Sequence, residues 1–203
     1  MFIGIWGGMS DDSAMNLVLH SERLALNPFA STELDLCLEM FTDPEVTKYV
    51  GGPMTNAAIK DCLPNWTKRG GDGCIGIWCI SDRRNGEKYG SVALLPMPID
   101  EDDTDFSLVI PGKIPGGDIE IGYFLKRSAW GRGYATEACG RLLDFVFQDS
   151  PLKEVVATFE KENTASRNVL IKAGFVDHGT MRSYGEEGPI FRIARDDWST
   201  RDE

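Results

Sequence analysis

The chain has 203 residues, of which 42% are hydrophobic and 26% are charged. These proportions are typical of one globular domain with its own core, and they exclude the disordered and membrane-spanning classes. The net charge of −11 disfavours nucleic-acid binding, which requires clustered lysine and arginine side chains. We therefore expect no nucleic-acid and no membrane partner, and an acidic surface suits a cationic or amine-bearing one.

The five cysteines form no C-x-x-C pair, and the chain has two histidines. This usage disfavours a disulfide framework and a zinc or other metal site. It is typical of a reducing compartment, so we expect a cytoplasmic location. Residues 1–14 are expected to be a flexible extension, and residues 15–198 one domain.

The first half of the chain contains both strand-like and helix-like segments. Pro64 is expected to end or kink its second helix, because proline lacks the N–H of the helical ladder. Asn85-Gly86 is expected to join two strands as a hairpin. In chain order we predict a strand at 21–27, helices at 32–40 and 56–66, and strands at 74–81 and 89–95.

The second half begins with residues 97–117, which are rich in proline and glycine and contain four consecutive acidic residues. We expect this stretch to be an exposed insertion whose 106–110 run docks back on the body. The elements predicted after it are a strand at 118–125, a helix at 134–148, a strand at 154–159, a helix between Asn163 and Gly174, and strands at 175–180 and 190–194 around a turn at 186–188.

A glycine-punctuated turn, Trp130-Gly131-Arg132-Gly133-Tyr134-Ala135, separates the strand at 118–125 from the helix at 134–148. Such a turn can leave backbone N–H groups unpaired at a helix start, where the helix dipole is positive. Amides in this position bind anions. The sequence therefore predicts a phosphate or pyrophosphate site at this turn.

Two common phosphate-binding signatures do not fit the turn. Counted from Gly131, the sixth position of a dinucleotide fingerprint is Thr136 instead of glycine, and the motif lies in the second half of the chain. The Gly-Lys-Ser/Thr signature of nucleotide triphosphatases is absent from the sequence. A nicotinamide oxidoreductase is thus a disfavoured alternative.

Three segments in combination resemble the GNAT acetyltransferase family. They are the strand 120–125, the turn with its helix start at 130–138, and the helix that runs from Glu162-Asn163-Thr164-Ala165-Ser166 to Ala173-Gly174-Phe175. Residues 21–24 and 43–46 are similar to the branch typified by ribosomal-protein N-terminal acetyltransferases. The resemblance runs from about residue 17 to 198 and implies a single-domain α/β (α+β) fold. It implies a mixed sheet of about six to seven strands flanked by about four helices.

The resemblance implies that acetyl-CoA is the acetyl-donor cosubstrate and lies where the strands 118–125 and 154–159 splay apart. It implies that backbone at Phe124 and Leu125 pairs with the pantetheine arm, and that Asn163 and Ser166 hydrogen-bond to it. A plain helix cap is the other interpretation of Asn163. The positions implied to hold the pyrophosphate are Gly131, Arg132, Gly133, Tyr134, Ala135 and Thr136.

The reaction implied is direct acetyl transfer to a primary amine. A lysine-like amine with a pKa of ~10 is mostly protonated at neutral pH, so a general base assists. Glu120 is the first candidate for this base and Tyr123 the second, with Asp118 and Tyr184 as alternatives.

Two positions depart from the family pattern. The residue before Gly131, often Gln or Arg in the broader family, is Trp130 here. Many relatives carry a tyrosine suited to protonating the leaving thiolate where this chain has Leu170. The expected function is an acetyl-CoA-dependent N-acetyltransferase whose acceptor is a protein N-terminus or a small-molecule amine. The alternative is a catalytically silent CoA-binding sensor or interaction module, and the sequence leaves monomer or homodimer open.

Overall fold

The structure is a computed structural model and describes residues 16–199. Its strands are β1 Leu19–His20, β2 Leu24–Pro28, β3 Arg69–Gly70, β4 Ile75–Asp82, β5 Lys88–Pro96, β6 Ile119–Leu125, β7 Glu154–Thr158, β8 Val176–Ser183 and β9 Glu186–Ala194. Its α-helices are α1 Leu34–Phe41, α2 Asn56–Trp66, α3 Tyr134–Asp149, α4 Thr164–Ala173 and α5 Arg195–Ser199. The predicted extension over residues 1–14 lies outside the described residues.

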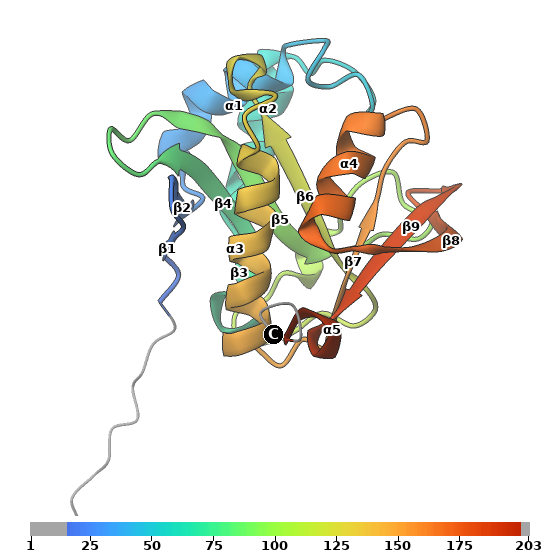
Figure 1. Cartoon of the computed structure of the whole chain (residues 1–203). Helices are drawn as coiled ribbons and strands as arrows, with labels where there is room; N and C mark the ends of the chain where they lie inside the picture. The colour runs from blue at the N-terminus through green and yellow to red at the C-terminus, as the bar shows by residue number, and fades with distance from the viewer. Residues whose placement is uncertain (1–15, 200–203) are drawn as a thin grey trace, which may run out of the picture.

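All the strands join one twisted mixed sheet in the order β1-β2-β4-β5-β6-β7-β9-β8, with β3 paired to β4 beside this path (Figure 1). Neighbouring strands are antiparallel except β6 and β7, which are parallel. The predicted α/β fold with a mixed sheet is therefore confirmed. Within residues 16–199 the sheet has nine strands and five α-helices accompany it, more than the six to seven and four expected. The additional elements are too short for a hydrophobic period to reveal them.

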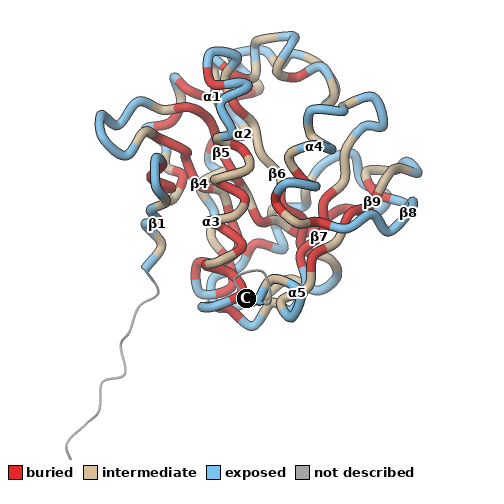
Figure 2. Tube along the Cα trace, in the orientation of Figure 1, coloured by how far each residue is buried: buried red, intermediate tan, exposed pale blue. Residues whose placement is uncertain are grey.

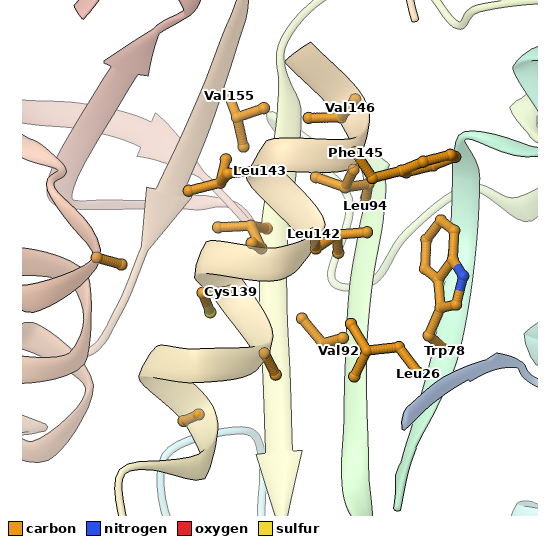
Figure 3. Packing of buried hydrophobic residues seen from close by; sticks show 14 of the residues in the cluster. Leu26, Trp78, Val92, Leu94, Cys139, Leu142, Leu143, Phe145, Val146 and Val155 are labelled. Carbon is orange, nitrogen blue, oxygen red and sulfur yellow. The ribbon is translucent and has the colours of Figure 1, made fainter. Parts of the chain in front are cut away.

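Helix α3 packs along one face of the sheet and carries most of the core (Figure 3). Its buried stripe includes Cys139, Leu142 and Val146, and its Phe145 packs edge-on against Trp78 of β4, with ring centroids 6.0 Å apart. Cys139 is completely buried in this cluster and is a packing residue. The buried segments in Figure 2 follow α3 and the central strands, so the main core lies between this helix and the sheet.

The other face of the sheet is covered by α1 and α2. Phe124 of β6 reaches this face and packs edge-on against Phe41, with ring centroids 5.2 Å apart. Side chains of successive residues in a strand point to opposite faces. Glu120 and Phe124 of β6 therefore lie on the α1–α2 face, whereas Tyr123 lies on the face of α3 and α4.

Helix α2 has the predicted bounds, 56–66, and Pro64 lies inside its last turn without ending it there, because the missing N–H affects only that turn. One local expectation was wrong. The turn between β8 and β9 is formed by Tyr184 and Gly185, with φ angles of 51° and 76°, and residues 186–188 belong to β9. Both central residues of such a two-residue hairpin turn have positive φ.

The insertion 97–117 is held to the body at several points. Val109 is 5% exposed and joins the core, and Phe106 packs beside it, so the expected docking of this run is present in the structure. The amide of Gly185 donates to the carbonyl of Ile99 at 2.9 Å, which ties the insertion to the β8–β9 turn. Within residues 16–199, no helix combines the length and apolar character that crossing a membrane would require.

Candidate active site

The strands β6 and β7 meet at one register pair, Glu120 with Val156. The next element after β6 is the glycine turn leading to α3, and the next after β7 is α4. Because the two strands are parallel, both helix starts lie at the same edge of the sheet (Figure 1). Ligands of α/β sheets bind outside the carboxyl ends of parallel strands, so this edge is the candidate site.

The register of β5 and β6 determines which backbone groups of β6 face β7. Lys126 donates its amide to the carbonyl of Tyr89, while Leu125 is the register partner of Gly90. Backbone groups alternate in direction along a strand, so the N–H and C=O of Phe124 point to β5 and those of Leu125 point to the β7 side. By the same alternation Tyr123, and not Phe124, is the second residue whose backbone faces the gap.

Trp130 stabilises this end of β6. Its indole Nε1 donates to the carbonyl of Leu125 at 2.8 Å. The Leu125 carbonyl therefore already accepts one hydrogen bond, and the groups of β6 that face β7 without such a partner are the Leu125 amide and the backbone of Tyr123. The resemblance to the family implied no role for Trp130.

The glycine turn presents amides as predicted. Gly131 and Gly133 have φ angles of 71° and 78°, a conformation that favours glycine. The first recorded amide bond of α3 runs from Glu137 to the carbonyl of Gly133. In the described part of the chain, no protein acceptor is recorded for the amides of residues 131–136. The turn thus fits a diphosphate on two grounds: unpaired donors and glycines that allow close approach.

Arg23 at the start of β2 braces this turn from a distant part of the sequence. Its Nη1 donates to the carbonyl of Arg132 at 2.9 Å, and its Nε pairs with Glu137 at 2.6 Å. The backbone amide of Arg23 and the hydroxyl of Ser21 also bond to Glu137, at 2.8 and 2.7 Å. Burial opposes ionisation of Glu137, but these hydrogen bonds outweigh it and lower the pKa of its carboxyl.

We expect Arg23→Ala to weaken CoA binding roughly three- to tenfold, because the turn loses a brace whose half-exposed ion pair has a modest effect. Arg84→Ala removes the same charge from the β4–β5 turn and serves as the control. Isothermal titration with CoA measures both variants. Equal affinities of the two variants would contradict a bracing role for Arg23.

Tyr134 contributes its backbone amide to the site, while its ring is used for packing. The ring stacks on Tyr89, with centroids 4.5 Å apart, and Arg23 lies over it at 4.8 Å. The exposed guanidinium of Arg132 lies 5.9 Å from the same ring. Two cationic groups therefore flank the helix start, as an anion-binding turn requires.

Helix α4 starts beside the gap with a side-chain cap. Asn163 Oδ1 accepts the amide of Ser166 at 3.1 Å, and Gly174 ends the helix at a φ of 94°, so both predicted caps are confirmed. Ser166 in turn bonds through Oγ to the phenol of Tyr123 at 2.8 Å. The structure thus brings Ser166, Asn163 and Tyr123 together at one side of the gap.

Glu120 is a buried carboxylate, 8% exposed, on the α1–α2 face. Its Oε1 accepts the amide and the hydroxyl of Thr158 at 3.1 and 2.5 Å, and its Oε2 accepts the phenol of Tyr184 at 2.6 Å. Burial raises the pKa of Glu120, and the bonds from Thr158 and Tyr184 act in the opposite direction without cancelling it. A raised carboxyl pKa is the property of a general base that works near neutral pH.

Tyr123 does not share a site with Glu120. Its phenol lies on the opposite face of β6, against Ser166. Burial raises the pKa of Tyr123, so the phenol remains protonated and is suited to donate a hydrogen bond and not to act as a base. Leu170, which stands where many relatives carry a tyrosine, is buried in the core and only 1% exposed.

Sequence reasoning missed or underrated four residues of the site. Thr158, Arg23 and Glu137 were given no role, and Tyr184 was only an alternative base. Thr158 lies two residues after Val156 and on the same face of β7. Only the parallel pairing of Val156 with Glu120 could have indicated that Thr158 lies beside Glu120. The contact of Arg23 with Glu137 joins segments too far apart in sequence for any spacing to indicate it.

Over residues 16–199 the sheet is mixed, its one parallel pair meets at a single register position, and an amide-rich turn lies at one of the two helix starts, so the fold is of the α/β class with a candidate anion site at this edge. Residues 23–176 match the family model described as an acetyltransferase (GNAT) domain. The chain belongs to the GNAT acetyltransferase family, and it is an acyltransferase. The family assignment made from the sequence is therefore confirmed.

Known proteins support the assignment at different levels. The chain is 30% identical over 168 residues, 82% of its length and 86% of the relative's, to the "Uncharacterized N-acetyltransferase p20" of Bacillus licheniformis. It is 33% identical over 63 residues, 31% of its length and 34% of the relative's, to the "Putative ribosomal N-acetyltransferase YdaF" of Bacillus subtilis. The fold is similar to a structure of the acetyltransferase AAC(6')-Ib in complex with paromomycin and acetyl-CoA, with a TM-score of 0.68 at 18% identity, covering 90% of this chain and 99% of that one. The ribosomal-protein branch is hinted at by one short match.

Proposed function

We propose that the protein transfers an acetyl group directly from acetyl-CoA to a primary amine, with both substrates bound together. The observation that carries this proposal is the turn of unpaired amides at residues 131–136 beside the gap between β6 and β7. A diphosphate on these amides directs the pantetheine arm along β6, toward Glu120. The AAC(6')-Ib structure, which holds acetyl-CoA and an aminoglycoside, supports a ternary complex by analogy of fold.

The pantetheine arm pairs with the backbone of Tyr123 and Leu125, the residues whose polar groups face β7. Asn163 and Ser166 lie on the other side of this path and orient the arm. The amine lone pair forms the new bond to the acetyl carbon, the C–S bond breaks, and sulfur leaves with the electron pair as thiolate.

Glu120 removes the proton that the amine nitrogen loses in this step. Its position beside the parallel pair, its burial and its raised pKa support the assignment. Tyr184 and Thr158 hold both carboxylate oxygens in place, which orients the base. Holding the two reactants together contributes further to the rate.

Tyr123 is the candidate acid in place of the tyrosine that many relatives carry at the position of Leu170. Its phenol reaches the start of α4 from β6, bonds to Ser166 there, and is kept protonated by burial. The CoA thiol, with a pKa near that of free cysteine, can also leave as a thiolate, so the acid is helpful without being required.

Thermal unfolding with acetyl-CoA, CoA and NAD tests the cofactor assignment. We expect acetyl-CoA and CoA to raise the Tm by several degrees at saturation, because ligands that bind only the folded state stabilise it, and NAD to have no effect. A shift with NAD alone would support the disfavoured oxidoreductase instead.

Thiol release from acetyl-CoA in the presence of an amine panel tests the transfer. Turnover with at least one primary amine is the expected result. Binding of CoA without turnover on any peptide N-terminus or small-molecule amine would support the alternative, a CoA-binding sensor. A cytoplasmic location, suggested by the unpaired cysteines, is part of this proposal, since acetyl-CoA must be supplied.

A further inference from the structure

A groove of about 380 Å³ lies between the end of α2 and the middle of the insertion, on the same face of the sheet as Glu120. The indole of Trp66 and the stem of Lys68 come from the α2 side, and residues 103–107 form the opposite wall. Trp66 is held in place by Phe41, with ring centroids 5.0 Å apart. The groove therefore combines a supported aromatic surface with an acidic wall.

Two carboxylates of the insertion line this groove, Asp103 and Asp105. Each accepts a backbone amide through its Oδ1: Asp103 from Thr104 at 2.7 Å, and Asp105 from Ser107 at 2.8 Å. These bonds fix both side chains. Lys68 Nζ donates to the carbonyl of Phe106 at 3.3 Å, and its charge also acts on the Asp105 carboxylate. Of the two carboxylates that line the groove, Asp105 is therefore partly balanced by Lys68.

The groove adjoins the proposed base through Thr104 and Tyr184. Thr104 lines the groove and its side chain lies near the Tyr184 phenol, which donates to Glu120 at 2.6 Å. The β8–β9 turn that carries Tyr184 is bonded to the insertion at the carbonyls of Pro98 and Ile99. A molecule bound in the groove is thus close to the group that would deprotonate its amine.

We propose that this groove binds a second cationic centre of the acceptor, so that the preferred acceptor is a small molecule with at least two ammonium groups, a di- or polyamine. The inference rests on the proposed acetyl transfer and specifies its substrate class. One ammonium lies against Trp66 and the two carboxylates, where cation–π and charge interactions add. The other nitrogen, deprotonated, reaches Glu120.

The other acidic residues of the insertion are arranged differently. Asp100 pairs with Arg182 of β8 at 2.6 Å, which anchors the insertion. Asp102 is exposed and does not line the groove. All five acidic residues of the insertion are exposed: Asp100 is an anchor, Glu101 and Asp102 lie outside the groove, and Asp103 and Asp105 line it.

The experiment compares kcat/KM for a homologous series of α,ω-diamines and for n-alkyl monoamines of matched length, measured by thiol release. We expect the diamines to be preferred at some chain length by about tenfold or more. The double variant Asp103→Asn/Asp105→Asn should raise the diamine KM by about 5- to 20-fold and remove most of this preference. Asparagine keeps the oxygen that accepts the amides of Thr104 and Ser107, so the insertion retains its local bonds.

Asp102→Asn removes one charge from the same segment and is the matched control, with kinetic constants like those of the unchanged chain. The Tm and the CoA affinity of every variant confirm folding. Equal kcat/KM for diamines and monoamines at all lengths, an unchanged diamine KM in the double variant, or transfer confined to peptide N-termini would overturn this inference and leave the acetyltransferase proposal intact. Absence of transfer to any amine would refute the proposed function itself.

Discussion

Replacing Glu120 by glutamine is expected to lower kcat by about 10²- to 10³-fold while the affinity for acetyl-CoA stays unchanged, because a general base contributes on this scale. Glutamine has the same shape, and it can direct its oxygen to the two donors of Thr158 and its amide to the oxygen of Tyr184. The fold should therefore persist. Steady-state kinetics and CoA titration separate the two effects.

Glu186→Gln, an exposed position in the β8–β9 hairpin, is the control for the loss of one negative charge. Tyr184→Phe removes one hydrogen bond to the base and should reduce kcat by a smaller factor, about tenfold. An unaltered kcat in Glu120→Gln would remove Glu120 from the mechanism and leave positioning as the main source of the rate.

The pH profile gives a second test of Glu120. Burial raises the pKa of its carboxyl, and a base functions only when it is ionised. The rate should therefore rise with pH through a midpoint above that of an ordinary carboxyl, in addition to the rise caused by deprotonation of the amine. Glu120→Gln should lack the lower of these two transitions and retain the upper.

Replacing Gly133 by valine is expected to weaken CoA binding by more than tenfold. Gly133 has a φ of 78°, which is unfavourable for a β-branched residue, and a Cβ there would lie 3.5 Å from Nη2 of Arg23. This distance is ordinary contact, so the substitution disturbs the amides of the turn through backbone strain. Strain of this kind costs about 1–3 kcal/mol, so the Tm should also fall by several degrees.

Gly86→Val is the matched control for this loss. Gly86 has a φ of 75° in the β4–β5 turn, and a Cβ there would contact nothing within 4 Å. Both variants should lose similar stability from backbone strain, whereas only Gly133→Val should lose the thermal shift caused by CoA. Equal CoA shifts in the two variants would show that the glycine turn does not hold the diphosphate.

The parts of the site that lie within one continuous segment could be predicted from the sequence. The glycine turn and the caps at Asn163 and Gly174 depend on local conformational preferences, which a short stretch of chain reveals. The boundaries of α3 were correspondingly close to those observed, Tyr134–Asp149. The assignment of the diphosphate site to residues 131–136 rests on the same local information and stays a prediction.

The parts that depend on pairing between segments could not be predicted. Which residues of β6 direct their backbone to β7 follows from the register with β5, and a shift of one residue would exchange Phe124 for Tyr123. The turn between β8 and β9 was misplaced because Tyr184 adopts a positive φ that non-glycine residues seldom have. Because the turn was misplaced, Tyr184 was not expected to bond to Glu120.

By itself the sequence determined the family, the order of the main elements and the two helix starts, since these follow from hydrophobic period and local capping. Only the tertiary structure decided that Glu120 lies with Thr158 and Tyr184, that Tyr123 lies on the opposite face, and that Arg23 supports the glycine turn. These contacts join residues 38 to 114 positions apart. Their geometry is created when the sheet forms, because the strand register selects which side chains share a face.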